Sequence, residues 1–263
     1  MAIISLTTDF GTQDEYVGVM KAVILGIDPS AAVVDVSHAI DPQDVAQAAF
    51  LVHAAHAYFP PGSIHLVVVD PGVGTARGIL LLDRGGHRFV APDNGVLSLM
   101  MDGGEPFRLR RLENPAWRLA AVSPTFHGRD IMAPAAARLC RGADPAEFGP
   151  EVDPRAVVRL QDVRPRRTPG GIDGRVVQVD RFGNLVTNID RETFDAVVAS
   201  GVPEIRVGDA VTRGIHQTYA DGAPGTLLAL FGSRGTLEVA VVGGDARRML
   251  GADKSATVRV RCP

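Results

Sequence analysis

Cysteine is scarce in this 263-residue sequence. Long apolar runs and basic clusters are absent from the sequence. The two cysteines, Cys140 and Cys262, are too few and too far apart for a disulfide framework or a thiolate metal site. No stretch approaches the roughly eighteen consecutive apolar residues that predict a membrane span. The net charge is −3, and the basic run Arg164–Arg167 is short and broken by proline, so a nucleic-acid surface is not expected.

The overall composition is that of a globular protein. Hydrophobic residues make up 46% of the chain and charged residues 22%, which provides ample material for a core. The length suits one large domain or two modest ones. The first residues enter an apolar segment with no basic region and no cleavage site before it, so we expect a soluble, cytoplasmic protein. We find no internal repeat and no low-complexity tract.

The segment Ile64–Arg77 is the centre of the predicted fold. Its first half is an almost unbroken aliphatic run, which predicts a strand buried on both faces. The strand should end at Asp70, because Pro71 lacks an amide proton and the following glycines permit positive φ. The carboxyl edge of an open α/β sheet is where ligands bind, and Arg77 can return a cation to that edge. The alternative is that Asp70 only caps the turn, with Arg77 as its exposed ion partner.

The chain up to Met101 shows strands and helices in alternation, which predicts a doubly wound, largely parallel sheet. We expect a helix capped by Thr12 or Asp14, and a second helix with Asp41 as the cap and Pro42 at its first position. The expected strands are Ile3–Thr7, Ala32–Val36, Ile64–Val69, Gly78–Asp83 and Arg88–Ala91; the helices end near Ile27 and Tyr58, and shorter ones follow at Val96–Met101 and Ile131–Cys140.

Polar side chains at the ends of these elements are candidate site residues. Asp9 follows the first strand, where a carboxylate either holds a ribose diol or caps a helix. His127 lies at a junction between a loop and a helix, where backbone amides favour anions. His53 and His56 are spaced i, i+3, as in some metal sites, but no Glu-x-x-His pattern surrounds them, so we interpret them as histidines on a helix surface.

Beyond a Pro- and Arg-rich stretch the pattern changes to short strands, and we place a domain boundary between residues 164 and 165. Glycine-rich turns separate these strands, which predicts a small β-barrel or sandwich. One helix, Arg191–Ala199, is expected with Asp190 as its cap. The expected strands are Gly174–Asp180, Leu185–Ile189, Glu204–Val207, Thr226–Phe231, Thr236–Val242 and Ala256–Arg261.

Six short motifs occur in the order expected of one family, and they span essentially the whole chain. On these motifs the sequence resembles the S-adenosyl-L-methionine (SAM) hydroxide adenosyltransferases, or SAM hydrolases, which are relatives of the fluorinases and chlorinases. The motifs are Thr8–Thr12, Asp70–Gly74, Ala91–Gly95, Phe126–Asp130, Asp180–Asn188 and Ser233–Gly235.

The resemblance implies an N-terminal α/β domain, a C-terminal β-barrel, and a homotrimer whose sites lie between neighbouring subunits. It implies attack of water on the ribose C5′ of SAM, with SAM as substrate and no cofactor or metal. Asp70, Arg77 and His127 match the residues that hold and activate the water. The implied substrate contacts are Asp9 for the ribose diol, Phe182, Asn184 and Tyr219 for adenosine, Asp180, Ser233 and Arg234 for methionine, and Glu238 and Val241 in the following strand.

Other activities remain as alternatives. A halide adenosyltransferase is disfavoured because Asp70 stands where fluorinases carry Tyr, and His127-Gly128 stands where they carry Tyr-Ser. A carboxylate repels halide but accepts a proton from water. A SAM- or adenosine-binding sensor with little turnover is a second alternative. A metallohydrolase using Asp9, Asp70 and His127 is a third, and it lacks a fourth ligand.

Overall fold

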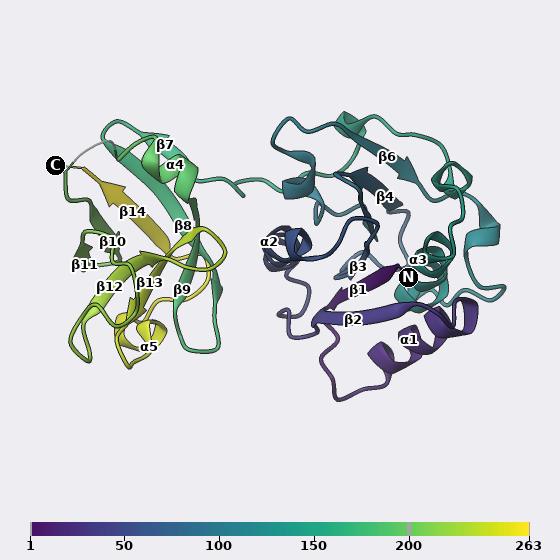
Figure 1. The fold of residues 1–263 in the computed structure, drawn as a ribbon, viewed down its shortest axis with the longest axis horizontal. Helices are drawn as coiled ribbons and strands as arrows, with labels where there is room; N and C mark the ends of the chain where they lie inside the picture. The colour runs from purple at the N-terminus through teal and green to yellow at the C-terminus, as the bar shows by residue number, and fades with distance from the viewer. Residues whose placement is uncertain (1, 199–200, 263) are drawn as a thin grey trace. The chain divides into compact units, whose positions relative to one another are not determined.

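The computed structural model describes residues 2–198 and 201–262. The chain divides into two compact units, 1–161 and 162–263, each with its own hydrophobic core. Figure 1 shows a mixed sheet flanked by helices in the first unit and a curved antiparallel sheet in the second. None of the helices in the described residues is both long and apolar enough to cross a membrane.

The first unit is built on one sheet with strand order β2-β1-β3-β5-β4-β6. Strands β1, β2, β3 and β5 run parallel, whereas β4 pairs antiparallel with both of its neighbours. Its elements are β1 (Ile3–Thr8), α1 (Tyr16–Ile27), β2 (Ala32–Ser37), α2 (Val45–Ala55), η1 (His56–Tyr58), β3 (Ile64–Val68), β4 (Ile79–Arg84), β5 (His87–Pro92), η2 (Ser98–Met101), β6 (Phe107–Arg111), η3 (Pro115–Trp117), η4 (Gly128–Met132), α3 (Ala133–Cys140), η5 (Pro145–Phe148) and η6 (Pro154–Ala156).

Strand β3 is buried throughout, and apolar except for His65, because it lies inside this sheet, between β1 and β5, with both faces covered. Leu66 and Val68 pack in one core cluster with residues of α1 and α3, including Met20 and Ala136. Helix α2 lies on the opposite face of the sheet (Figure 1). Helices on both faces confirm the predicted doubly wound, largely parallel architecture.

The second unit is an almost closed antiparallel sheet with strand order β11-β10-β14-β8-β9-β13-β12, and β7 also pairs with β8. Its end strands approach each other, since the Thr212 hydroxyl of β11 donates to the Leu227 carbonyl of β12 at 3.1 Å. This confirms the predicted barrel-like fold. The elements are β7 (Arg166–Thr168), β8 (Gly171–Val179), β9 (Leu185–Asp190), α4 (Arg191–Asp195), β10 (Glu204–Val207), β11 (Ala210–Arg213), β12 (Leu227–Phe231), β13 (Thr236–Val241), α5 (Ala246–Leu250) and β14 (Thr257–Arg261).

The structure corrects several predicted helix starts. Helix α1 begins after Glu15, which makes no side-chain capping bond, so neither Thr12 nor Asp14 is its cap. Helix α2 is capped by Asp44, whose carboxylate accepts from the Gln47 amide, so the cap is not Asp41 and Pro42 lies before the helix. Capping residues are plentiful in both segments, and packing selects among them.

Other corrections concern short elements. The helix predicted over Val96–Met101 is a 3₁₀ turn that begins at Ser98. Strands β6, β7 and β11 and helix α5 were not predicted; they are short or lie at sheet edges, where periodicity is weak. Asp190 caps α4 as predicted, through the Thr193 amide, but the helix ends at Asp195, and its predicted end, Ala199, lies outside the described residues.

Candidate functional site

Asp70 and Arg77 form a buried ion pair just beyond the end of β3. Arg77 Nε lies 2.9 Å from each carboxylate oxygen of Asp70, and Nη2 also bonds Oδ2. The two side chains are only 5% and 9% exposed, so Arg77 is not the exposed partner that the alternative interpretation required. A guanidinium that contacts a carboxylate through two nitrogens fixes the orientation of both groups.

Glycine is required in the turn that carries this pair. Gly74 has a φ of +79°, and a Cβ there would come within 2.4 Å of the Pro124 carbonyl oxygen. Gly72, which we also expected to use positive φ, does not. The close approach at Gly74 brings the Asp70 turn against the loop that leads to His127. Two loops far apart in sequence therefore meet at one edge of the sheet.

His127 completes the cluster. Arg77 Nη2 lies 3.0 Å from His127 Nδ1. Because a guanidinium only donates, Nδ1 must be the acceptor, which leaves the proton of the neutral ring on Nε2. Burial lowers the pKa of His127 and the Arg77 charge lowers it further, against the opposing effects of Asp70 and Asp130. The ring is therefore neutral at pH 7, with Nε2–H as a donor.

The His127 side chain lies at an irregular helix start. The first turn after it, η4, is a π-helix that continues into α3. A Cβ at Gly128 would come within 2.9 Å of Val68 Cγ1, so only glycine allows this turn to pack on β3. Arg77 and His127 also line a cavity of about 260 Å³, together with Arg111 and Arg118. The cluster thus borders a space that can admit small molecules.

Asp9 lies at the same edge of the sheet as Asp70, because β1 and β3 are parallel neighbours and Thr8 is in register with Val68. Its Oδ2 accepts a 2.8 Å bond from the Gln43 amide. The cap of α1 is Glu15, so the interpretation of Asp9 as that cap is wrong. Gln43 itself has a φ of +67°, an uncommon conformation for a residue with a Cβ, and this conformation accompanies the bond to Asp9.

Three aromatic rings that were not predicted as part of the site form a cluster, and two of them are chain neighbours of Asp9 and His127. Phe10, Tyr16 and Phe126 pack against one another with ring centroids 5.3–5.7 Å apart. Phe10 follows Asp9 directly and Phe126 precedes His127. Adjacency to the two polar residues was the available signal, but aromatic packing between distant loops is not visible in a sequence.

The interpretation of His53 and His56 as surface residues holds only for His53. The His56 ring is half-buried and packs edge-on against the rings of His65, His87 and Phe89. Within residues 2–198 and 201–262, no group of histidine, cysteine and acidic side chains is arranged to hold a metal ion.

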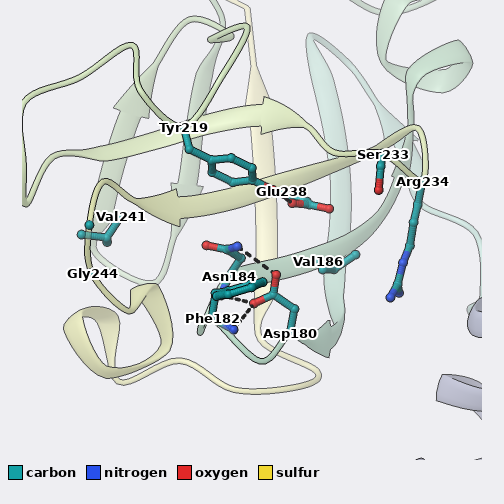
Figure 2. A pocket seen from close by; sticks show the side chains of 11 residues that line it. Asp180, Phe182, Asn184, Val186, Tyr219, Ser233, Arg234, Glu238, Val241 and Gly244 are labelled. Atoms are coloured by element: carbon teal, nitrogen blue, oxygen red, sulfur yellow. Dashed lines mark hydrogen bonds between the residues drawn. The ribbon is translucent and has the colours of Figure 1, made fainter. Parts of the chain in front are cut away.

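The second unit contains a cavity of about 580 Å³ (Figure 2). All eight substrate-contact residues predicted in this unit line it. They are Asp180, Phe182, Asn184, Tyr219, Ser233, Arg234, Glu238 and Val241. The prediction missed Val186, Gly243 and Gly244, which also line it. Val186 lies near the start of β9, two residues after Asn184, and this closeness to a motif residue was the available signal.

The turn between β8 and β9 forms one wall of this cavity. Asp180 Oδ1 accepts from the amides of Phe182 and Asn184 at 2.8 and 2.9 Å, and Oδ2 accepts from Asn184 Nδ2 at 2.8 Å. These bonds fix the turn and leave the Phe182 ring 77% exposed at the cavity. An exposed aromatic ring beside a fixed amide is suited to stack and hydrogen-bond a nucleobase.

A buried carboxylate lies deeper in the cavity. Glu238 is 5% exposed, and the Tyr219 hydroxyl donates to its Oε2 at 2.7 Å. Burial raises the pKa of Glu238, and nearby Asp180 raises it further. Burial and the hydrogen bond to Glu238 raise the pKa of Tyr219, so its hydroxyl stays protonated and donates. The cavity therefore combines aromatic walls with acidic groups and one guanidinium, that of Arg234.

Comparison with known families gives one consistent result. The model of the SAM hydroxide adenosyltransferase N-terminal domain matches residues 4–149, and that of the C-terminal domain of the same family matches residues 174–259. A Thermus thermophilus protein named (R)-S-adenosyl-L-methionine hydrolase is 40% identical, with 96% of this chain and 97% of that protein covered. A fluorinase from an Actinoplanes species is more distant, at 28% identity and 90% coverage of each chain.

Solved structures share the fold. A crystal structure of an uncharacterized conserved protein from Thermotoga maritima superposes with a TM-score of 0.91 at 36% identity, covering 99% of this chain and all of that one. A conserved hypothetical protein from Thermus thermophilus superposes with a TM-score of 0.79 at 38% identity and the same coverage. Both units of the chain are therefore represented in a single known architecture.

Proposed function

This chain belongs to the SAM hydroxide adenosyltransferase family, and we propose from that premise that it hydrolyses S-adenosyl-L-methionine to adenosine and L-methionine. The observation that carries the proposal is the full-length similarity to proteins named SAM hydrolases, at 40% identity. The hydrogen-bonded cluster of Asp70, Arg77 and His127 supports it, because these are the residues expected to hold the attacking water.

The reaction needs a nucleophile more than it needs help for the leaving group. Water's oxygen forms a bond to C5′ while the C5′–S bond breaks with its electron pair going to sulfur. The sulfonium leaves as a neutral thioether, so no general acid is required, and one proton is released from the water. Water has a pKa of ~15.7, so full deprotonation by a carboxylate of pKa ~4 would cost roughly 16 kcal/mol.

The three residues of the first unit would therefore act on a bound water rather than make free hydroxide. The guanidinium of Arg77 would stabilise the negative charge that develops on the oxygen. His127 would orient the water through Nε2–H, because its Nδ1 is already bonded to Arg77. Among the residues that the structure describes, only Arg77 donates to Asp70 Oδ1, so this oxygen can accept the water's proton as the C–O bond forms.

The substrate-binding roles are part of the same proposal. Asp9 would accept bonds from the ribose hydroxyls in the first unit, which would hold C5′ beside the water. In the second unit, Phe182, Asn184 and Tyr219 would bind the adenosine half. Asp180, Ser233 and Arg234 would bind the methionine half, with Glu238 and Val241 beside them. The support for these eight contacts is that all of them line one cavity.

Since the proposed roles are divided between two units, we infer that the active form is a homo-oligomer, a trimer, with sites shared between subunits. A head-to-tail contact between two different surfaces must close into a ring or polymerise, and a ring is the natural solution. The proposal includes a metal-independent reaction and a cytoplasmic location. Turnover that survives prior incubation with a chelator would support the first of these.

The test is product analysis. Purified protein incubated with SAM in ¹⁸O-labelled water should give adenosine and methionine in equal amounts, with the label in the adenosine 5′-hydroxyl. Unlabelled adenosine would refute direct attack of water on C5′. Binding of SAM without any product would favour a sensor instead. Formation of 5′-halo-adenosine on addition of chloride or fluoride would favour the activity of the more distant fluorinase relatives.

A further inference from the structure

Glu238 has an unusual position for a carboxylate. It lies on β13, is 5% exposed, and reaches into the cavity beside Tyr219 (Figure 2). Its Oε2 accepts from the Tyr219 hydroxyl, whereas its Oε1 accepts no hydrogen bond from any residue that the structure describes. Gly232 leaves room for Oε1, since a Cβ there would lie 1.9 Å from it. The chain thus keeps one oxygen of a buried carboxylate open to the cavity.

Holding an ionised carboxylate in this place costs free energy. Burial penalises the charged form, and the nearby charge of Asp180 adds to that penalty. The Tyr219 hydroxyl and the charge of Arg234 offset only part of it. Groups held at such a cost are commonly functional, because a ligand of opposite charge recovers the lost stabilisation.

The charges of the cavity match those of the proposed substrate one for one. SAM carries an α-carboxylate, an α-ammonium and a sulfonium, with a net charge of +1. Arg234 lines the cavity and bonds an amide, that of Gln178, with no carboxylate partner among the described residues, so it can take the α-carboxylate. Asp180 can take the α-ammonium. The charge that remains on the ligand is the sulfonium, and the charge that remains in the cavity is Glu238.

We propose that Glu238, held in place by Tyr219, recognises the sulfonium charge and makes the cavity select SAM over neutral thioethers. This inference rests on the proposed function and specifies how its substrate is chosen. Hydrolysis turns the sulfonium into a thioether and gives two products of zero net charge. The attraction to Glu238 therefore ends with the reaction, which favours release of the products and binding of the next SAM.

The same interaction has a kinetic consequence. The positive charge on sulfur fades as the C5′–S bond breaks, so Glu238 stabilises the bound substrate more than the transition state. Interactions that are stronger in the ground state lower KM without raising kcat. A residue that only supports the shape of the cavity would give no such separation between KM and kcat.

The experiment compares SAM with S-adenosyl-L-homocysteine, which lacks the methyl group and the sulfonium charge. Affinities for both are measured by calorimetry for the wild type and for Glu238→Gln. We expect the wild type to prefer SAM, and Glu238→Gln to lose roughly ten- to a hundredfold in SAM affinity while its affinity for the thioether changes little. Its KM for SAM should rise and its kcat should not fall.

Two further variants separate charge from shape. Glu192→Gln removes one carboxylate from the exposed start of α4, outside the cavity, and should leave both affinities unchanged. Tyr219→Phe keeps the ring but removes the hydroxyl that holds the Glu238 side chain. It should reduce the ratio of SAM affinity to thioether affinity, but by less than Glu238→Gln does. Thermal unfolding of each variant checks that it folds.

The inference would be overturned if Glu238→Gln lost affinity equally for SAM and for S-adenosyl-L-homocysteine. A fall in kcat at unchanged KM would also overturn it. If Glu238→Gln does not fold, the ratio of the wild type's affinities for SAM and for the thioether is the deciding measurement. Equal affinities would refute a charge-selective cavity. Turnover of SAM without that preference would leave the proposed function standing and this inference refuted. Preference for SAM without turnover would refute the hydrolysis and leave the inference standing.

Discussion

Acid should destabilise the first unit because it buries neutral histidines. His65 is 2% exposed, and Ser5 Oγ lies 2.7 Å from its Nδ1. Its Nε2 lies 3.1 Å from Nδ1 of His87, and its ring stacks on Phe89 at 4.7 Å. Burial, together with repulsion from His87 and His56, lowers the pKa of His65 to about 3. Burial also lowers the pKa of His87.

The sign and size of the effect follow from proton linkage. In the unfolded chain the pKa of the imidazole is 6.5, so between pH 6.5 and about 3 the unfolded state binds a proton at His65 that the folded state does not. The contribution of His65 is fully present above pH 6.5 and is lost as the pH falls. The loss is about 1.4 kcal/mol per pH unit, or about 2 kcal/mol between pH 7 and pH 5. His87 adds to it in the same direction.

The assay is urea unfolding between pH 5 and 7, followed by tryptophan fluorescence. The chain has one tryptophan, Trp117, which is 2% exposed in the first unit and therefore reports on the unit that contains His65. His65→Gln removes the titrating group, so its free energy of unfolding should start lower but decline less steeply with acid. His53→Gln, which removes an exposed histidine of the same unit, is the matched control. Equal slopes for the wild type and His65→Gln would refute the argument.

Two further predictions concern turnover. Asp70→Asn, Arg77→Ala and His127→Ala should each lower kcat for SAM by roughly 10²–10⁴, and Asp70→Asn should leave SAM affinity nearly intact because it contacts the water. An Asp70→Asn variant with wild-type turnover would contradict the assignment. Mixing Asp70→Asn with the double variant Asp180→Ala/Arg234→Ala should restore activity once subunits exchange. In a mixed ring, some sites combine the intact first unit of the double variant with the intact second unit of Asp70→Asn. Mass spectrometry confirms the exchange, and mixed oligomers without activity would exclude shared sites.

Local sequence determined much of what this protein is. The largely apolar run Ile64–Val69 predicted a strand buried on both faces, ended by the Asp-Pro-Gly that follows. Strand β3 (Ile64–Val68) is that strand. The substrate contacts expected in the second unit came from the resemblance to a known family, and all eight of them line one cavity. The strand and its end depend on residues close together in the chain, whose apolar pattern and backbone restrictions can be read directly from the sequence.

Contacts between distant segments were decided only by the tertiary structure. Three features depend on which loops pack together. They are the capping of α2 by Asp44 in place of Asp41, the burial of the Arg77 guanidinium, and the bond of that guanidinium to His127. The bond between Tyr219 and Glu238 joins a loop to a strand nineteen positions away. A sequence specifies which side chains are available, but a hydrogen bond across the fold requires the geometry that packing of the whole unit creates.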